Sequence, residues 1–231
     1  MSGKLTFTTL REDVATLLRS KILRGEIKPG EKINEVEISK EFAISRGPVR
    51  EALRQIEQEG LITYRPNKGC TVKTLSPEEM SELYLIRSTL EALAIRVYSA
   101  DMGGESLNEL YRVCGEIEVA AKEGNLAAIV SLDQEFHSII VREAGLEALY
   151  KTWKSFDGSN VATYFTMQSQ GLVPTDFVAH NHRIIADALN EKDLDKSIHM
   201  IQTHYMVVPR ELYKHNKLPG AKILNVYGVD G

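Results

Sequence analysis

Apolar residues recur at helical spacing in six successive segments between Pro77 and Asn216, and this pattern restricts the fold more than any other feature. Residues three or four positions apart lie on one face of an α-helix, so each segment can bury an apolar stripe. The breaks between segments are short, which favours antiparallel neighbours. We therefore predict an all-helical antiparallel bundle with helices in residues 77–100, 105–124, 126–145, 147–167, 175–193 and 194–216.

The first 74 residues show a different pattern, in which three helical segments precede a β-hairpin. These elements are expected in residues 10–25, 33–45, 45–60 and 61–75. In the third helix Ser45 can cap the first turn, Pro48 stands near the start, and Gly60 ends the run. The hairpin segment alternates apolar and β-branched residues on both sides of a Pro-Asn-Lys-Gly turn. Three helices and a hairpin predict a winged helix-turn-helix, whose last helix can enter the major groove of DNA.

The two patterns meet at Ser76, which with Pro77 and Glu79 forms the sequence of a capped helix start. The predicted domains are residues 1–74 and 75–216, with residues 217–231 as a tail whose place the sequence does not indicate. The fold class is therefore mainly α. The first domain carries 14 Lys and Arg against 10 Asp and Glu, whereas the remainder carries 14 against 22. A basic module of this kind is compatible with binding to DNA phosphates.

The composition predicts a cytoplasmic protein without a membrane partner. No apolar run approaches the roughly 18 residues of a membrane span, and the start MSGKLTF lacks the apolar core of a signal peptide. Cys70 and Cys114 form no C-x-x-C motif. We expect both thiols to be reduced and structural.

Three arginines share one side of the proposed recognition helix, since Arg46, Arg50 and Arg54 recur every four residues. The inward face of the same helix is expected to comprise Val49, Leu53 and Ile56. Arginine can form two hydrogen bonds with guanine O6 and N7, and near a helix start it also reaches phosphates. The alternative is a solvated face with ion pairs to Glu51 or Glu57. The flanking helix and hairpin favour the DNA-contacting interpretation.

Four polar residues lie on the apolar faces of the predicted bundle helices, namely Asp133, His137, His182 and His204. A single histidine on such a face is more often a hydrogen-bonded core residue than a metal ligand. An unpaired buried carboxylate is costly, however, and a divalent cation bound by one aspartate and three neutral imidazoles removes that cost. This donor set suits zinc or nickel better than manganese or iron. The remaining histidines are expected at the surface, at His180, His199 and His215.

The first domain resembles the GntR superfamily of bacterial transcriptional regulators. The resemblance lies in EISKEFAISRGPVREALRQIEQEGLI followed by NKGCTV, and it spans about residues 8–74. Arg46 and Arg50 match arginines that contact bases or backbone in that family, and Gly69 matches the wing-tip glycine. The complete set of DNA-binding residues expected here is Ser45, Arg46, Arg50, Arg54, Lys68 and Gly69.

Two departures from the family pattern concern the operator. Val36 stands where many relatives have a DNA-contacting arginine, and Gly47 replaces a commoner threonine. The operator sequence should therefore not be copied from a relative. The resemblance still implies a homodimer on a palindromic operator, because dimer symmetry is mirrored in the DNA site.

Residues 76–216 resemble the FCD effector domain of the FadR subfamily, on the motifs DQEFH, NHRIIADAL and MIQTHY. Many members carry one aspartate and three histidines there, which bind a metal that engages a small carboxylate effector. The matching residues are Asp133, His137, His182 and His204. The fatty-acyl branch lacks this set, which disfavours an acyl-CoA ligand. Arg87 aligns with a recurrent arginine that could meet the effector carboxylate, and the alternative is a salt bridge to Glu91.

The expected function is a ligand-responsive regulator, by family habit a repressor, in which a metal-bound organic acid biases the arrangement of two DNA-binding heads. One alternative is a purely structural metal. Another is a metal-dependent hydrolase, since an ion with open positions can activate water. Hydrolysis usually needs a nearby general base, and no second buried carboxylate is expected because Glu135 and Asp187 point outward. We therefore predict that the protein is not an enzyme.

Overall fold

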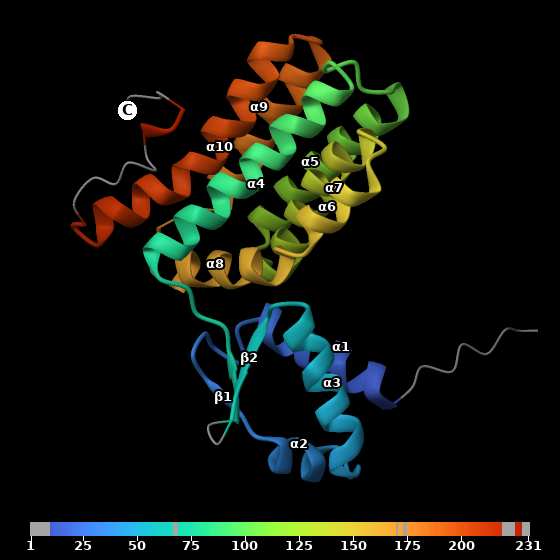
Figure 1. Ribbon diagram of the computed structural model, residues 1–231, viewed down its shortest axis with the longest axis vertical. Coiled ribbons are helices and arrows are strands. Elements are labelled where there is room, and N and C mark those ends of the chain that lie inside the picture. The colour runs from blue at the N-terminus through green and yellow to red at the C-terminus, as the bar shows by residue number, and fades with distance from the viewer. Residues whose placement is uncertain (1–9, 67–68, 170, 173–174, 219–224, 228–231) are drawn as a thin grey trace, which may run out of the picture. The chain divides into compact units, whose positions relative to one another are not determined.

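The computed structural model of the protein describes residues 10–66, 69–169, 171–172, 175–218 and 225–227. The chain divides into two compact units, residues 1–74 and 75–231 (Figure 1). Helices predominate in the sequence of elements, and all the strands described lie in the first unit. The prediction of a mainly α fold is confirmed.

The first unit is a winged helix-turn-helix, as predicted. Its elements are α1 (Leu10–Leu23), β1 (Lys32–Ile33), α2 (Glu35–Glu41), α3 (Arg46–Gln58), β2 (Ile62–Arg65) and β3 (Gly69–Val72). The strands pair antiparallel in the order β1-β3-β2, with Ile62 opposite Val72 and Arg65 opposite Gly69. The edge strand β1 was not predicted, because two residues are too few to show an alternating pattern.

The third helix, α3, packs on α1 through a buried apolar face. Val49, Leu53 and Ile56 form that face, as the helical spacing predicts. Ser45 occupies the N-cap position, but its hydroxyl makes no capping hydrogen bond, so that part of the prediction is wrong. A cap hydroxyl normally accepts from the N–H of the second or third helical residue. Here the third residue is Pro48, which has no N–H.

Seven helices make up the second unit within the described residues. They are α4 (Pro77–Val97), α5 (Gly104–Lys122), α6 (Leu126–Glu143), α7 (Glu147–Lys154), α8 (Asp157–Ser169), α9 (Thr175–Asn190) and α10 (Leu194–His215). α10 lies along α4, and α5 packs on both α6 and α9 (Figure 1). The predicted capping box is present, since Ser76 and Glu79 each accept a hydrogen bond from the other's backbone N–H.

One helix predicted over residues 147–167 is two helices in the structure, α7 and α8. Ser155, Asp157 and Gly158 are weak helix formers, which lowers the cost of a break at this point. The break lets α7 and α8 each pack on α4 and α6 with a face of its own. As a result, α7 buries Trp153 and α8 directs Asp157 toward the centre of the bundle.

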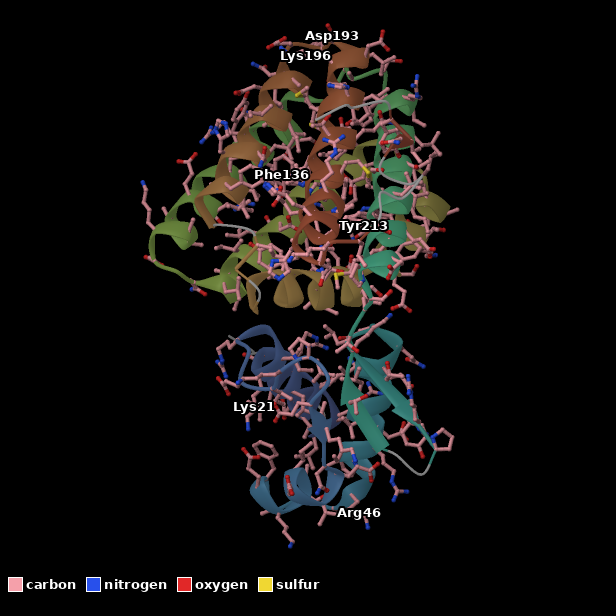
Figure 2. The ribbon with its side chains drawn as sticks, turned by 90° about the vertical axis from the view of Figure 1, so that its left-hand side faces the viewer. Lys21, Arg46, Phe136, Asp193, Lys196 and Tyr213 are labelled. Atoms are coloured by element: carbon pink, nitrogen blue, oxygen red, sulfur yellow. The ribbon has the colours of Figure 1, made fainter. Side chains whose placement is uncertain are left out.

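The centre of the bundle is apolar over most of its length. Phe136 lies inside it, whereas Asp193 and Lys196 lie at one outer end (Figure 2). Cys70 in the first unit and Cys114 in the bundle are buried free thiols, as expected. In the part of the chain that the structure describes, no helix has the length and apolarity of a membrane span.

Part of the C-terminal tail contacts α4. The hydroxyl of Tyr227 lies 2.7 Å from that of Ser88 and 3.0 Å from that of Thr89. The sequence indicated no place for the tail. These contacts attach residues 225–227 to the second unit.

Candidate metal centre

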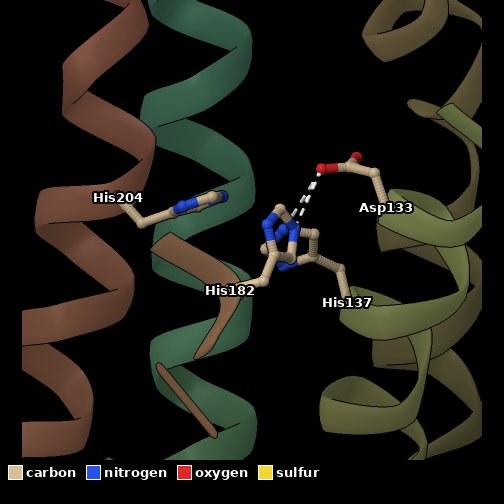
Figure 3. Close-up of side chains that lie close together, drawn as sticks. All are labelled: Asp133, His137, His182 and His204. Carbon is tan, nitrogen blue, oxygen red and sulfur yellow. Dashed lines mark ion pairs between the residues drawn. The ribbon is translucent and has the colours of Figure 1, made fainter. Parts of the chain in front are cut away.

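Four side chains from three helices meet inside the bundle (Figure 3). α6 supplies Asp133 and His137 from successive turns, α9 supplies His182, and α10 supplies His204. Each residue offers one potential ligand atom, and these four atoms all lie within 4.8 Å of one another. The structure thus brings together all four residues expected from the sequence. The other three histidines are exposed, as predicted: His180, His199 and His215.

Hydrogen bonds at Nδ1 determine which nitrogen two of the histidines turn toward this cluster. Nδ1 of His182 lies 2.7 Å from the carbonyl oxygen of Val178, and Nδ1 of His137 lies 2.7 Å from a carboxylate oxygen of Glu91. Both partners are acceptors, so Nδ1 is the donor nitrogen in each ring, and Nε2 is the nitrogen that faces the cluster.

The buried Nε2 of His182 provides a test of whether these residues fit a metal. It makes no hydrogen bond within the described residues, although it lies 3.1 Å from Oδ1 of Asp133. Nε2 of His137 lies 3.8 Å from the same oxygen. A lone pair and a carboxylate oxygen repel at such distances unless a proton or a cation lies between them. The donor set and its arrangement therefore fit a divalent cation.

The ionisation states in the cluster also fit metal binding. Burial disfavours the charged form of Asp133, but its interactions with the nearby His182, His137 and His204 outweigh burial, so the pKa of Asp133 is lowered. Burial, followed by the proximity of His182 and His137, lowers the pKa of His204 well below its usual value. A carboxylate and a neutral imidazole are the forms that bind metals. Asn160 on α8 donates to Oδ2 of Asp133 at 3.3 Å and so orients the carboxylate.

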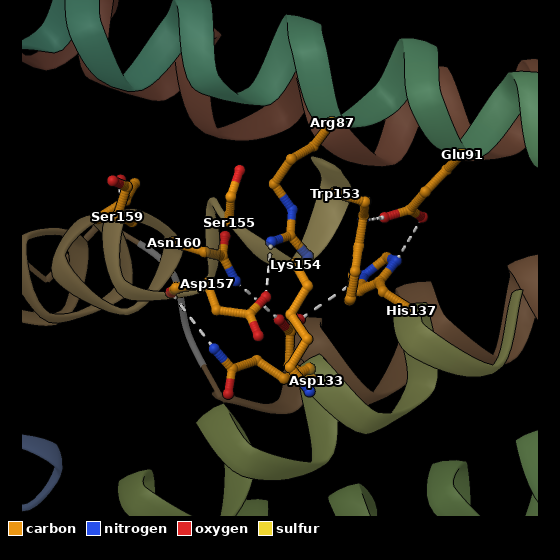
Figure 4. Close-up of polar contacts among 12 residues, drawn as sticks. Arg87, Glu91, Asp133, His137, Trp153, Lys154, Ser155, Asp157, Ser159 and Asn160 are labelled. Atoms are coloured by element: carbon orange, nitrogen blue, oxygen red, sulfur yellow. Dashed lines mark hydrogen bonds and ion pairs between the residues drawn. The ribbon is translucent and has the colours of Figure 1, made fainter. Parts of the chain in front are cut away.

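A second buried carboxylate lies behind His137, so the expectation that the bundle holds only one is wrong. Glu91 on α4 is fully buried. It accepts hydrogen bonds from Nδ1 of His137 and from Nε1 of Trp153 at 2.7 Å (Figure 4). It also accepts one from the hydroxyl of Tyr205. A carboxylate bonded to the outer nitrogen of a ligand histidine fixes the tautomer and the ring orientation.

Arg87 is fully buried beside this network. Its Nε donates to the Tyr205 hydroxyl at 3.2 Å. Its Nη1 lies 3.5 Å from Asp157, and its guanidinium lies 4.3 Å from the ring centre of Trp153 (Figure 4). Asp157, and not Glu91 as the sequence suggested, is the ion-pair partner. Burial alone would lower the pKa of Arg87, but the nearby Tyr205, Glu91 and Asp157 raise it.

A cavity opens beside the four-residue cluster, and its wall is mostly apolar. The apolar side chains of the wall are Met167, Phe177, Val178, Val207 and Val208. Tyrosine hydroxyls and the side-chain amides of Asn160 and Asn181 supply the polar groups. Arg87 is not among the described lining residues, which include neither lysine nor arginine.

The three arginines of α3 lie on the surface of the first unit. The side chains of Arg46, Arg50 and Arg54 are 57%, 56% and 70% exposed. Glu35 on α2 lies 3.7 Å from Arg46 and 3.1 Å from Arg50, whereas Glu51 lies 2.9 Å from Arg54. Exposed ion pairs contribute only about 0–1 kcal/mol each, so the guanidiniums remain available for stronger partners.

The wing begins its second strand at Gly69, whose φ of +83° lies in the left-handed region that favours glycine. Lys68, which was also expected to contact DNA, lies outside the described residues. Glu57, the other expected partner of the arginines, accepts instead from the backbone N–H of Tyr64 at 2.9 Å. It therefore connects α3 to β2.

Two family models match the chain. Residues 10–72 match the bacterial regulatory proteins of the gntR family, and residues 82–206 match the FCD domain. A "Probable D-xylose utilization operon transcriptional repressor" of Paenarthrobacter nicotinovorans is 30% identical over 203 residues, which cover 88% of each chain. The protein belongs to the GntR family. Its combination of domains is consistent with the FadR subfamily.

Three further proteins are similar to this chain, one in sequence and two in fold. The "Uncharacterized HTH-type transcriptional regulator YdhC" of Bacillus subtilis is 36% identical over 125 residues, which cover 54% of this chain and 56% of that one. A GntR regulator from Rhodococcus sp. RHA1 has a TM-score of 0.76 at 19% identity over 90% of this chain and 99% of its own. Escherichia coli McbR/YncC has a TM-score of 0.71 at 20% identity, and the match covers 91% of this chain and 100% of that one. At these identities the two solved structures show the shared fold.

As a GntR-family member, the protein is a DNA-binding transcriptional regulator and not an enzyme, in agreement with the prediction. The position of Glu91 fits this conclusion. Its carboxylate lies at the Nδ1 side of His137, whereas Nε2 of that ring faces Asp133. Glu91 therefore orients His137 from its outer side and does not face the position where a hydrolase would hold its water.

Proposed function

We propose that the protein is a homodimeric repressor of a palindromic operator whose bundle binds a divalent metal, zinc or nickel, together with a small organic acid that relieves repression. The arrangement of Asp133, His137, His182 and His204 carries this proposal. Three nitrogen donors and one oxygen donor suit zinc or nickel. The bound ion would supply a positive centre for a carboxylate in a cavity whose described lining residues otherwise offer only neutral or anionic groups.

In this proposal the bundle residues have distinct tasks. The four cluster residues would hold the ion, Glu91 would orient His137, and Asn160 would orient Asp133. Arg87 would position Tyr205 and Asp157, which it contacts, and would not touch the acid itself. In the first unit, the α3 arginines would exchange their exposed carboxylate partners for DNA phosphates and guanine edges.

Native mass spectrometry of freshly purified protein tests the metal, the acid and the homodimer together. We expect a dimer with one divalent ion in each chain, and we expect the variant His137→Ala to lose the ion. The variant Arg112→Ala, which changes an exposed arginine of the bundle, is the matched control and should keep it. A wild-type protein that stays metal-free after growth with zinc and nickel would refute the proposed site.

A purely structural metal is the second candidate, because the cluster joins α6, α9 and α10 and a bound ion would cross-link them. The two candidates differ in their response to acids. A structural ion predicts that chelation lowers the melting temperature and that carboxylates change nothing. The proposed effector site predicts that a carboxylate raises the melting temperature of metal-loaded protein, has no effect on His137→Ala, and releases operator DNA in a mobility-shift assay.

A further inference from the structure

We infer that the effector is a monocarboxylate with an apolar aliphatic or aromatic body, and not a polyhydroxylated sugar acid or a di- or tricarboxylate. The inference rests on the proposed metal-and-carboxylate function and narrows its ligand class. Three independent features of the cavity support it: the charge of the cluster, the engagement of its polar groups, and the chemistry of its wall.

The charge of the cluster matches one carboxylate. A divalent cation, the single negative charge of Asp133 and three neutral imidazoles leave one positive charge, which one monoanion neutralises. A second carboxylate would need a further cation, and the described lining residues include no lysine or arginine. Residues 165–176, from the last turn of α8 to the first residues of α9, include no lysine or arginine in the sequence. Arg87 is already held by Tyr205 and Asp157. A buried charge without a partner is strongly unfavourable.

Three of the polar groups around the cavity are already engaged with the protein itself, on Asn160, Asn181 and Tyr205. The Asn160 amide donates to Asp133, and the Asn181 amide donates to a backbone carbonyl at 3.0 Å. The Tyr205 hydroxyl donates to Glu91. A sugar acid brings several hydroxyl groups, each of which loses its water on entering. The three engaged groups would have to give up their present partners to replace that water, and unpaired buried hydroxyls weaken binding.

The wall itself favours an apolar ligand body. Met167 comes from α8, Phe177 and Val178 from α9, and Val207 and Val208 from α10. They face the cavity beside the metal cluster, so an acid whose carboxylate meets the ion would place its body against them. Displacing water from such a wall favours hydrocarbon over hydroxylated groups.

The affinities of three six-carbon acids for the metal-loaded full chain test the effects of a second carboxylate and of hydroxyl groups separately. Hexanoate is the reference, adipate adds a second carboxylate, and gluconate adds hydroxyl groups. Benzoate represents an aromatic body. Calorimetric titration should show hexanoate or benzoate binding at least about tenfold more tightly than adipate and gluconate. Metal content is measured by native mass spectrometry after each titration, so that chelation by the acid is not mistaken for binding.

A variant in the wall tests the charge argument directly. Val208→Lys places a cation in the cavity and should raise the affinity for adipate relative to hexanoate by roughly tenfold. Val208→Met has a similar length without charge and should leave that ratio unchanged. If the melting curve shows that Val208→Lys does not fold, Val207→Lys replaces it. A folded lysine variant with an unchanged ratio would contradict the charge argument.

The outcomes also separate this inference from the proposed function. If gluconate or adipate binds more tightly than hexanoate and benzoate, the ligand class is wrong and the metal-and-carboxylate function stands. If the metal-loaded protein binds none of the four acids, the proposed effector function fails, and the inference fails with it. Tighter binding of hexanoate or benzoate supports both.

Discussion

Replacing Glu91 by alanine should destabilise the bundle and weaken metal binding at the same time. The substitution removes the acceptor for three buried donors, on His137, Trp153 and Tyr205. Each buried donor left without a partner costs about 1–3 kcal/mol. Water entering the space that is left can satisfy some of them, so we expect a loss of about 3–5 kcal/mol in the free energy of unfolding. Glu91→Gln keeps the shape and one acceptor oxygen, and should lose about half as much.

Urea unfolding of metal-free protein, followed by circular dichroism, measures the stability without any contribution from the ion. Calorimetric titration of zinc then measures the affinity, which should fall by about 10- to 100-fold in Glu91→Ala because His137 loses its orienting partner. Glu82→Ala removes an exposed carboxylate from the same helix and should stay within about 0.5 kcal/mol of wild type. If Glu91→Ala has the same free energy of unfolding as Glu82→Ala and the same zinc affinity as wild type, Glu91 does not position His137.

Three further predictions concern other parts of the chain. Arg50→Ala should weaken DNA binding and reduce its salt slope by about one unit, whereas Arg112→Ala on the bundle should change neither in a mobility-shift series. Burial raises the pKa of the Cys114 thiol to about 11 and also raises that of Cys70, so both stay protonated at about pH 8. Iodoacetamide should therefore label them only after denaturation, and rapid labelling of native protein would contradict the burial. Tyr227→Phe should speed proteolytic removal of the tail while changing the stability of the bundle by less than about 1 kcal/mol, and unchanged proteolysis would show that the hydroxyl does not hold the tail.

The cluster was predictable from the sequence because its residues interrupt an apolar stripe. Asp133 and His137 stand one turn apart where the pattern requires apolar residues, and burial of both follows. Glu91 carries the same signal, since it lies seven residues after Tyr84 and four before Ile95, both of which are buried. It was missed because Arg87 precedes it by four residues, and opposite charges at that spacing are typical of an exposed helix face.

Other features depend on contacts that local sequence does not encode. The break between α7 and α8 follows weak helix formers, but similar residues occur within intact helices, and packing on α4 and α6 decides where the chain turns. The pairing of Arg46 and Arg50 with Glu35 joins two helices separated by a turn. A pattern within one helix can suggest only partners on that helix, such as Glu51.

The same contacts indicate how occupancy of the metal centre can reach the DNA-binding unit. An effector changes DNA affinity only if the arrangements that bind and release DNA differ in their affinity for it. Asp133 is bonded to α8 through Asn160, and His137 is bonded to α4 through Glu91. α4 begins at Pro77, only a few residues after β3 ends at Val72. In the proposed regulator, a ligand that repositions His137 would therefore act through the Glu91 carboxylate on α4, the first helix after the wing.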